Sequence, residues 1–574
     1  MDRLRQLFAI IADNNHTTAE RFRKEIESTG ISIDDFRISG TMAKLNALGD
    51  QAIDCDLFAK IIGEELIILS KILSRQLVIP DWPEFCSDID IVFRQVALET
   101  NGSNADYIPI LRDADPEKWG VALCTVDGQR IGLGDIDVYH SIQSVCKPLN
   151  YAYALASEGI DFTHKFVGVE PSGRRFNDLT MLTDARPYNP CVNAGAIMTA
   201  GIVASGSPQL NAREITQQIM NLWSRLCGHC AEVLFSEETM ISERDTADTN
   251  FAIAHLLRGQ IGLPRGVDLH KMMDVYLSCC SIEMTARMLS VAAATLANGG
   301  VCPITGEQVL TTDVVKKTLS IMQMAGMYDN AGAFVLEVGL PAKSGVAGAL
   351  LVVVPNLMGF ATFSPRLDEF GNSVRGVSFC RQLVDRFTFH MYDSLSGGRS
   401  GCKHDPRASQ KNRKNSDISD LRWALSHGDL YAAKVRDLIL ECMISVSLAD
   451  GELEEAEINV IGDIYTEILA LQPNYSELRA LALSKQERAN EATKLGHNTP
   501  FQNLIETLKK ELPVLDDNAC EMILESAFRV ACADGEVEEE EEQMLQTIAN
   551  ALNINKRVLE LEISLFKRHL AAKH

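Results

Sequence analysis

The N-terminal segment carries apolar side chains at the spacing of amphipathic helices. Leucine, isoleucine and phenylalanine recur three and four positions apart, which places them on one face of a helix. Examples of this spacing are Leu4, Leu7, Phe8 and Ile11 and, further along, Phe58, Ile61, Ile62 and Leu66. The pattern predicts a small all-α domain over residues 1–104.

The period of the apolar positions then falls to two. Val121, Leu123 and Thr125 alternate with their neighbours, which is typical of a strand with two different faces. Asp127-Gly128 is a favoured two-residue hairpin turn, and the chain returns over Gln129–Gly132. These residues predict an antiparallel hairpin.

Strand patterns return at the far end of the same region. Phe334–Val338 and Leu350–Phe363 are apolar and rich in strand-forming residues, with a break at Pro355-Asn356, and Val374–Arg386 has helical periodicity. Helical and glycine-punctuated segments fill the interval. The order predicts an α+β domain over residues 105–395, with an antiparallel sheet made from both ends and helices inserted between them.

Composition changes again beyond this domain. Residues 396–418 are rich in Gly, Ser and basic residues and almost free of apolar ones, which predicts a flexible basic linker. Residues 419–574 contain 29 acidic and 15 basic side chains. The acids gather in Ala449–Glu457 and Ala533–Glu541, each placed between two apolar helical runs. The repetition predicts a duplicated unit of helix, Asp-Gly turn and helix.

Charge and cysteine content narrow the class of partner. A formal charge of −24 over 574 residues repels nucleic acid and anionic lipid, so neither nucleic acid nor a membrane is expected as a partner. The longest apolar stretch, Gly348–Phe363, is too short to span a bilayer. Fifteen cysteines without a disulfide framework, and an N-terminus without an export signal, favour a reducing compartment. We expect a cytoplasmic location.

Ser144-Val-Cys-Lys147 opens an apolar helix and can bring a nucleophile to a base. Residues three apart share one helical face, so the Ser144 hydroxyl and the Lys147 amine can meet. A serine becomes nucleophilic when a neighbouring base takes its proton, and a lysine with a burial-lowered pKa can do so. Amide N–H groups at the helix N-terminus would stabilise an oxyanion. The motif is common, and a capping serine beside a surface lysine is the alternative.

Two further motifs strengthen the case for serine chemistry. Lys343-Ser-Gly345 lies between two strand patterns, as does the Lys-Thr-Gly motif of serine β-lactamases and penicillin-binding proteins. Their middle motif is matched better by Asn193 than by Tyr328-Asp-Asn330, which lies too close to Lys343. An acylase directed at β-lactams or peptides is therefore one alternative function.

A longer ordered series of motifs spans the same domain. It comprises Asp106–Pro109, Cys124–Arg130, Ser144–Tyr151, Glu170–Gly173, Val192–Ile197, Ser242–Arg244, Asn250–Ile253, Ala292–Gly300 and Gly339–Gly348. The series closely resembles the serine-dependent glutaminase family, including its kidney-type members. The resemblance implies a catalytic domain with the fold of serine β-lactamases and penicillin-binding proteins, in which helices flank an antiparallel sheet.

The same resemblance implies a reaction and the residues that perform it. L-glutamine would be hydrolysed to L-glutamate and ammonia through an ester on Ser144, with Lys147 as the base, Tyr328 in the same pocket and no cofactor. The implied substrate-binding residues are Tyr107, Ser144, Asn193, Glu243, Asn250, Tyr276, Tyr328 and, through its backbone N–H, Val346. A carboxylate for the ammonium and neutral donors for the carboxylate suit a zwitterionic amino acid.

Assembly and the flanking domains are also part of what the resemblance implies. Family members form dimers, tetramers or filaments, so we expect a homo-oligomer, with phosphate or another anion as a possible activator. The loop Arg174–Met181 departs from the kidney-type pattern, which has a basic residue near Asp178 and an aromatic one near Thr180.

The N-terminal domain resembles a degenerate EF-hand pair, and the tail resembles a TerB-type tellurite-resistance domain. A second alternative is a scaffold protein whose catalytic domain is degenerate. The presence of every catalytic residue argues against it.

The candidate ion sites in the flanking domains can also be explained without a bound ion. The segment after Asp13 has Thr18 where a calcium loop needs glycine and Lys24 where it needs glutamate, so no calcium is expected there. The acidic tail offers weak metal candidates, namely Asp450, Glu452, Asp534 and Glu536. Acid at the start of a helix is also favourable without a metal, and a solvated face is the favoured interpretation.

Cys227-Gly-His-Cys230 has the spacing of a redox or zinc motif. A helical pattern precedes it, whereas thioredoxin-type motifs follow a strand, and no second pair of cysteines or histidines supplies further zinc ligands. A plain structural role is the favoured interpretation.

Overall fold

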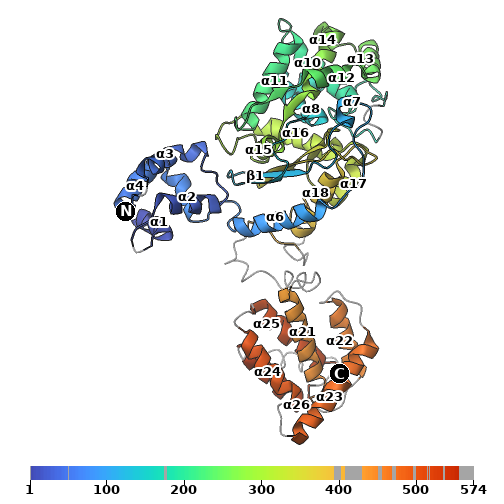
Figure 1. Ribbon diagram of the computed structural model, residues 1–574. Coiled ribbons are helices and arrows are strands. Elements are labelled where there is room, and N and C mark those ends of the chain that lie inside the picture. The colour runs from blue at the N-terminus through green and yellow to red at the C-terminus, as the bar shows by residue number, and fades with distance from the viewer. Residues whose placement is uncertain are drawn as a thin grey trace. The chain divides into compact units, whose positions relative to one another are not determined.

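The computed structural model describes most of the chain in two compact units. The described residues are 2–13, 15–49, 51–173, 178–393, 403–407, 430–449, 455–467, 474–495, 499–512, 515, 517–533 and 537–554. Unit 1 comprises Met1–Tyr392 and Asp405–Arg407, and unit 2 comprises Asp393–His404 and Ala408–His574 (Figure 1). No helix in the described ranges is long and apolar enough to cross a membrane.

Unit 1 begins with a bundle of short helices. Their bounds are α1 (Asp2–Ile11), α2 (Ala19–Ser28), η1 (Phe36–Ile38), α3 (Ser39–Leu48), α4 (Cys55–Ile62), η2 (Gly63–Glu65) and α5 (Leu66–Leu73). Thr18 and Asp54 cap α2 and α4 by accepting hydrogen bonds from backbone N–H groups in the first turn. The buried faces meet around Phe22 and Phe58. The helices predicted from the N-terminal periodicity are confirmed.

An antiparallel sheet forms the centre of unit 1. Its strands are β1 (Gly120–Thr125), β2 (Arg130–Gly134), β6 (Ala342–Ser344), β7 (Ala349–Val354) and β8 (Met358–Phe363). The strand order is β2-β1-β8-β7-β6, so the first hairpin of the domain pairs with its last strands. A second, small sheet joins β3 (His140–Ser141), β5 (Ile282–Met284) and β4 (Leu234–Phe235). The predicted sheet from both ends of the domain is confirmed, with β6 at its edge.

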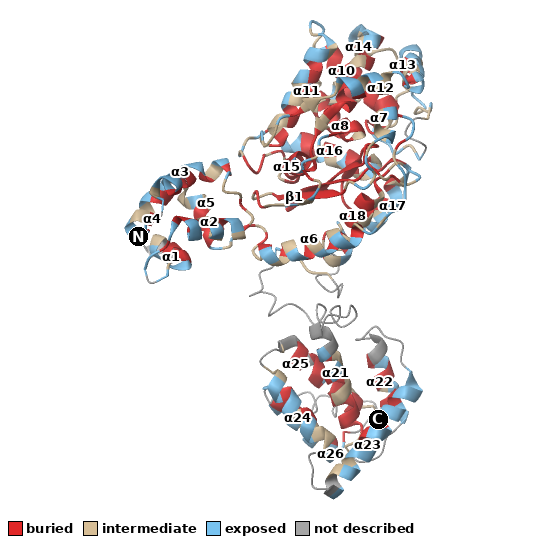
Figure 2. Cartoon of the chain, in the orientation of Figure 1, coloured by how far each residue is buried: buried red, intermediate tan, exposed pale blue. Residues whose placement is uncertain are grey.

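Both faces of the large sheet are covered. Val121 and Leu123 of β1 face the core that also contains α6 (Trp82–Val96) and α18 (Val374–Arg386). The alternating Ala122 faces the opposite core, where α15 (Ala286–Ala297) packs against β8. Figure 2 shows the strands around β1 as buried, while exposed and buried positions alternate along α6. The predicted segment 1–104 therefore contributes to two cores, because α6 packs on the sheet.

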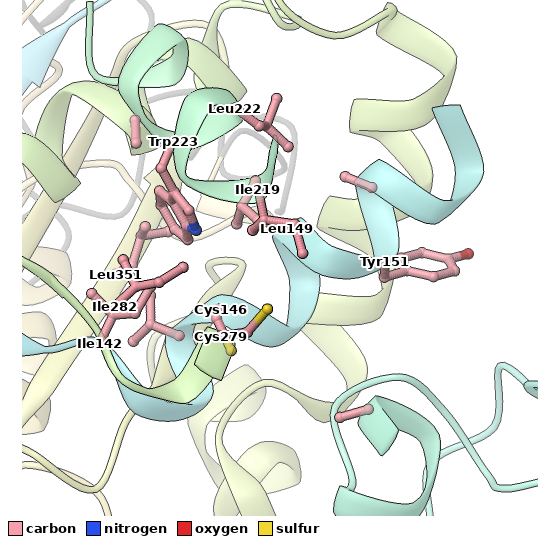
Figure 3. Close-up of a cluster of buried hydrophobic side chains, with 14 of the residues drawn as sticks. Ile142, Cys146, Leu149, Tyr151, Ile219, Leu222, Trp223, Cys279, Ile282 and Leu351 are labelled. Carbon is pink, nitrogen blue, oxygen red and sulfur yellow. The ribbon is translucent and has the colours of Figure 1, made fainter. Parts of the chain in front are cut away.

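A layer of helices lies beyond α15 and carries most of the remaining core. Its members are α7 (Pro109–Arg112), η3 (Gln143–Val145), α8 (Cys146–Glu158), α9 (Ile160–Thr163), α10 (Asn193–Gly206), α11 (Ala212–Leu226), α12 (Glu237–Arg244), α13 (Asp248–Gln260), η4 (Pro264–Gly266), α14 (Leu269–Cys280) and α16 (Thr312–Ala325). Figure 3 shows Leu149 of α8, Trp223 of α11 and Cys279 of α14 within this core. Helix α8, whose first turn carries Lys147, is therefore held by packing on several sides.

The strand predicted over Phe334–Val338 is wrong. Those residues lie in helix α17 (Ala331–Glu337) and its C-cap, directly after the turn η5 (Tyr328–Asn330). A short apolar run fits a strand or a buried helix equally well, and here Phe334 is the side chain that packs inward. Gly339, with φ of 66°, ends the helix in the left-handed conformation.

The β1–β2 turn is hydrogen-bonded to the helical bundle. The Gln129 side chain is fully buried and donates to the carbonyls of Thr29 (2.8 Å) and Ile79 (2.9 Å). Its oxygen accepts from the Ile79 N–H at 3.1 Å, and Asp127 accepts from the Val78 N–H at 2.7 Å. The turn predicted at Asp127-Gly128 is therefore also the joint between the bundle and the sheet.

Unit 2 is helical. Its described helices are α21 (Leu430–Val446), α22 (Glu455–Glu467), α23 (Tyr475–Leu495), α24 (Pro500–Glu511), α25 (Asp517–Ala531) and α26 (Glu539–Ala551). A shared core includes Ile439, Ile523 and Leu545. The pairs α21–α22 and α25–α26 flank the two acidic segments, as the predicted duplication requires. The metal candidates Asp450, Glu452, Asp534 and Glu536 lie outside the described residues, as does most of the predicted linker.

We expect Gly359→Ala to destabilise unit 1, because β8 and α15 approach each other at this glycine. A Cβ there would lie 2.1 Å from the Ala294 nitrogen and 2.2 Å from the Ala293 carbonyl carbon, and backbone atoms cannot move aside easily. The expected loss is about 1–3 kcal/mol. Thermal unfolding followed by tryptophan fluorescence measures it.

Gly259→Ala in α13 is the matched control. Nothing lies within 4 Å of a Cβ at that position, so alanine should leave stability unchanged or raise it by up to about 1 kcal/mol. Equal melting temperatures for both variants would contradict the close approach of β8 and α15.

Candidate active site

Ser144 lies where the turn η3 passes into helix α8. The preceding Gln143 has φ of 46°, an uncommon conformation for a residue with a side chain. Ser144 keeps partial exposure between buried neighbours, Gln143 and Val145. The backbone therefore presents this hydroxyl at the start of α8, the position that the sequence predicted.

Lys147 follows in the first turn of α8 and is buried, with 1% exposure. Its amine donates to Oδ1 of Asn193 at 2.6 Å and to the Cys191 carbonyl at 3.3 Å. Burial lowers the pKa of the Lys147 ammonium. A neutral amine has two N–H groups and one lone pair, so these two hydrogen bonds leave the lone pair for accepting a proton.

Tyr328 connects Ser144 with the edge strand β6. Its hydroxyl donates to the Ser344 carbonyl at 3.0 Å, and the Ser144 side chain is hydrogen-bonded to it. The buried amine of Lys343 lies 4.2 Å from the centre of the Tyr328 ring and donates to the carbonyls of Gly326 (3.0 Å) and Ser344 (2.6 Å). Burial is the main cause that lowers the pKa of Lys343 to about 7, and the charge of the nearby Lys147 acts in the same direction.

Glu243 at the end of α12 supplies a buried carboxyl group. Burial raises its pKa to about 7, and hydrogen bonding from Gln143 (3.2 Å) and the charge of Lys147 partly oppose that rise. Tyr107 and Tyr276 lie within electrostatic reach of Glu243. Tyr276 is buried, whereas Tyr107 is half exposed and also lies near Tyr328.

Two asparagines connect the base to the other wall of the site. Asn193, the first residue of α10, accepts from Lys147 through Oδ1 and donates through Nδ2 to Oδ1 of Asn250 at 2.9 Å. Asn250 lies on α13. Because each contact uses a specific amide atom, the orientation of Asn193 is determined from both sides.

Val346 lies in the turn after β6. Its side chain packs with Tyr328, and no hydrogen bond within the described ranges engages its backbone N–H. Gly345 approaches the loop before Ser144 so closely that a Cβ would lie 2.7 Å from the Ile142 carbonyl. The backbone at Gly345, next to Val346, therefore lies against the segment that leads into η3 and Ser144.

A cavity of about 470 Å³ adjoins these residues. Tyr328, Val192 and Asn189 are among its lining residues, together with Pro171–Gly173. The next residues of that loop, 174–177, lie outside the described residues. Asp178 and Thr180, near which the sequence departs from the kidney-type pattern, are described.

The structure brings all the predicted site residues together and adds two. Ser144, Lys147, Tyr107, Asn193, Glu243, Asn250, Tyr276, Tyr328 and Val346 share one region, and their roles stay predictions. Sequence analysis missed Gln143 as the partner of Glu243 and treated Lys343 only as part of a strand motif. A lysine within an otherwise apolar strand run was the available signal for Lys343. Nothing in the spacing indicates the contact between Gln143 and Glu243.

Three family models match this chain. The glutaminase model matches residues 102–392, the EF-hand domain model residues 2–80, and the model of tellurite resistance protein TerB residues 467–561. The first match covers the sheet, the helical layer and every residue of the site. The N-terminal and C-terminal resemblances predicted from the sequence are confirmed.

Curated relatives and solved structures carry the same family name. The glutaminase liver isoform, mitochondrial, of Mus musculus is 38% identical over 465 residues, covering 78% of this chain and 76% of its own. Putative glutaminase 3 of Caenorhabditis elegans is 38% identical, covering 72% of each chain, and the glutaminase of Corynebacterium glutamicum is 42% identical, covering 54% of this chain and 73% of its own.

Among solved structures, native Mglu in 4.3 M NaCl superposes with a TM-score of 0.51 at 37% identity. That similarity covers 55% of this chain and 72% of the other. The shared part is the α+β catalytic domain, whose fold is that of the β-lactamase-like enzymes. From the matched family model and the coverage of these relatives, the chain belongs to the glutaminase family.

Proposed function

We propose that this chain hydrolyses L-glutamine to L-glutamate and ammonia through an ester on Ser144. The observation that carries the proposal is the environment of Lys147. This amine is buried, its pKa is lowered, and its two hydrogen bonds leave a lone pair free in the helical turn that follows the partly exposed Ser144. No cofactor is needed for such an acyl transfer.

Acylation begins with the Ser144 hydroxyl. Its oxygen attacks the side-chain carboxamide carbon of glutamine while the Lys147 amine takes the hydroxyl proton. Tyr328, hydrogen-bonded to Ser144 and held by the Ser344 carbonyl, fixes the direction of the hydroxyl. The backbone N–H groups of Ser144 and Val346 stabilise the negative oxygen of the tetrahedral intermediate.

Ammonia leaves when this intermediate collapses. The C–N bond breaks, and Lys147 returns its proton to the departing nitrogen, which leaves the glutamyl ester on Ser144. A water molecule then attacks the ester carbon, with Lys147 again taking a proton. The ester C–O bond breaks, Ser144 regains its proton, and glutamate is released.

Recognition of the amino acid uses the buried polar walls. Glu243 pairs with the substrate ammonium, and that pairing restores the charged form that burial disfavours. Asn193, Asn250 and Tyr276 supply donors for the substrate carboxylate. Homo-oligomerisation, activation by an anion and the cytoplasmic location stay predictions.

Ser144→Ala and Lys147→Ala should each abolish glutamine turnover. Both side chains act in one proton-transfer unit, so either loss should lower kcat by at least roughly 10³-fold. Steady-state ammonia release measures this, and circular dichroism checks the fold. The exposed Lys316→Ala in α16 is a control that should retain full activity. Activity above roughly a tenth of wild type in either site variant would refute the mechanism.

Glu243→Gln should raise KM for glutamine while changing kcat less. The substitution keeps the shape of the side chain and its contact with Gln143 but removes the charge that pairs with the ammonium. The expected rise in KM is roughly 10–100-fold, the cost of leaving a charged group unpaired in a buried site. An unchanged KM would show that Glu243 does not receive the substrate ammonium.

The kcat/KM should fall on the acid side of neutrality. Below about pH 7 the Glu243 carboxyl is protonated and cannot pair with the ammonium. Protonation of Lys147, whose pKa burial lowers, removes the base as the pH falls. Each titration contributes about tenfold per pH unit. Glu243→Gln should therefore have an acid limb shallower by one proton, and identical limbs in the two enzymes would contradict this assignment.

A further inference from the structure

The Cys227-Gly-His-Cys230 motif forms a tight turn at the end of helix α11. Cys227 is the C-cap residue, and Gly228 (φ 64°) and His229 (φ 54°) both have left-handed backbone conformations. Helix α11 directly precedes the motif, as the sequence predicted, whereas a strand precedes the motif in thioredoxin-type folds. Thiol chemistry, however, depends on the geometry and charge around the two sulfurs.

The turn holds the two cysteines at a distance that a disulfide can bridge. The Cys230 N–H donates to the Cys227 carbonyl at 3.3 Å, which closes a four-residue turn. The ends of such a turn have Cα atoms within about 7 Å of each other. Disulfides span Cα separations of about 4.4–6.8 Å, so both sulfurs can bond without moving the helix.

The two thiols have different surroundings. Cys227 is fully buried, and its sulfur lies 3.3 Å from the Ser224 carbonyl oxygen in the last turn of α11, where a negative sulfur is disfavoured. Cys230 is partly exposed and lies near the guanidinium groups of Arg130 and Arg287. The hydrogen bond from the Cys227 thiol, followed by these two cations, lowers the pKa of Cys230.

Arg130 adds a second, geometric observation. Its Nε–H is buried and has no hydrogen-bond partner among the described residues, although its other nitrogens approach Asp35 at 3.7 Å. A buried unpaired donor is costly, and a neighbouring anion removes that cost. A Cys230 thiolate is the anion that the turn places near it. Arg287, by contrast, already pairs with Asp137 at 2.8 Å.

We propose that Cys227 and Cys230 form a thiol–disulfide exchange site for small disulfides such as oxidised glutathione. The Cys230 thiolate attacks one glutathione sulfur, the glutathione S–S bond breaks, and one glutathione thiolate leaves and gains a proton. The Cys227 thiol then loses its proton and attacks the Cys230 sulfur, which displaces the second glutathione. The two protein thiols are oxidised by two electrons, and one disulfide is reduced to two thiols.

Two more thiols lie close enough to compete as the second partner. Cys302 Sγ lies 3.0 Å from where a Cβ on Gly228 would be, and Cys124 is within electrostatic reach of Cys230. Both are fully buried in rigid surroundings, Cys124 within strand β1. Only Cys227 shares a turn with Cys230, so it is the partner that requires no rearrangement.

The test uses the full-length protein in glutathione buffers of increasing oxidised fraction. Remaining thiols are alkylated, and tryptic peptides are analysed by mass spectrometry. The peptide 226–244 contains Cys227 and Cys230 and no other cysteine. We expect it to lose two hydrogens and resist alkylation while the partly exposed Cys55 and Cys86 stay reduced. Glutamine turnover is not part of this readout, so it is independent of the proposed function.

Variants separate the two steps. Cys227→Ser should accumulate glutathione on Cys230, and Cys230→Ser should leave Cys227 unmodified. Iodoacetamide at neutral pH should alkylate Cys230 of the Cys227→Ser variant more than about tenfold faster than Cys55 in the same protein. Arg287→Gln should slow that alkylation several-fold, whereas Arg287→Lys should retain most of the rate.

Three outcomes would overturn the proposal. One is an alkylation rate of Cys230 equal to that of Cys55. Another is the absence of a glutathione adduct in Cys227→Ser. The third is an oxidised product that joins Cys230 to Cys124 or Cys302.

Discussion

The organisation of the site depends on one constraint, the cost of burying charge. Lys147 of helix α8, Lys343 of strand β6 and Glu243 of helix α12 are all buried. An ion moved into such surroundings must neutralise or find a partner. The enclosed lysines therefore shift toward neutral amines and the carboxyl toward a neutral acid. In the proposed reaction, the ammonium of the amino acid supplies a countercharge for Glu243.

The same constraint explains why so much of the surrounding structure is rigid. Three buried polar side chains of the site are each held by a defined partner: Lys147 by Asn193, Asn193 by Asn250, and Glu243 by Gln143. These side chains come from η3, α8, α10, α12 and α13. η3, which carries Ser144, contacts strands β6 and β7 directly, and α15 contacts β8 so closely that position 359 tolerates nothing larger than glycine. The position of the nucleophile thus depends on packing against the sheet.

Sequence analysis found the parts of this arrangement that have a local signal. Alternation predicted β1, and an apolar run with a break at Pro355-Asn356 predicted the β7–β8 pair. Helical spacing predicted α11 and α18, an apolar run after the Ser144 motif predicted α8, and motif spacing with family resemblance located the site residues. It failed at α17, where a short apolar run has no period of its own, and it did not place α6 on the sheet. The sequence analysis did not identify the contacts of Lys343 and Gln143 for a related reason. These contacts depend on burial and on partners distant in sequence, and the spacing of residues along the chain reveals neither.

The hydrogen bonds at Gln129 affect which amino-acid substitutions the two parts of unit 1 can accept. Asp127 and Gln129 make their contacts with their side chains, whereas their partners are main-chain groups, at Thr29 in the bundle and at Val78 and Ile79 in the segment that leads to α6. Main-chain groups are the same whatever residue carries them. A residue of similar size and polarity at Thr29, Val78 or Ile79 therefore keeps these four hydrogen bonds, whereas replacement of Asp127 or Gln129 removes them. Thr29 and Ile79 are buried, so packing still limits which side chains fit there. For these hydrogen bonds, chemical identity is required only on the hairpin side.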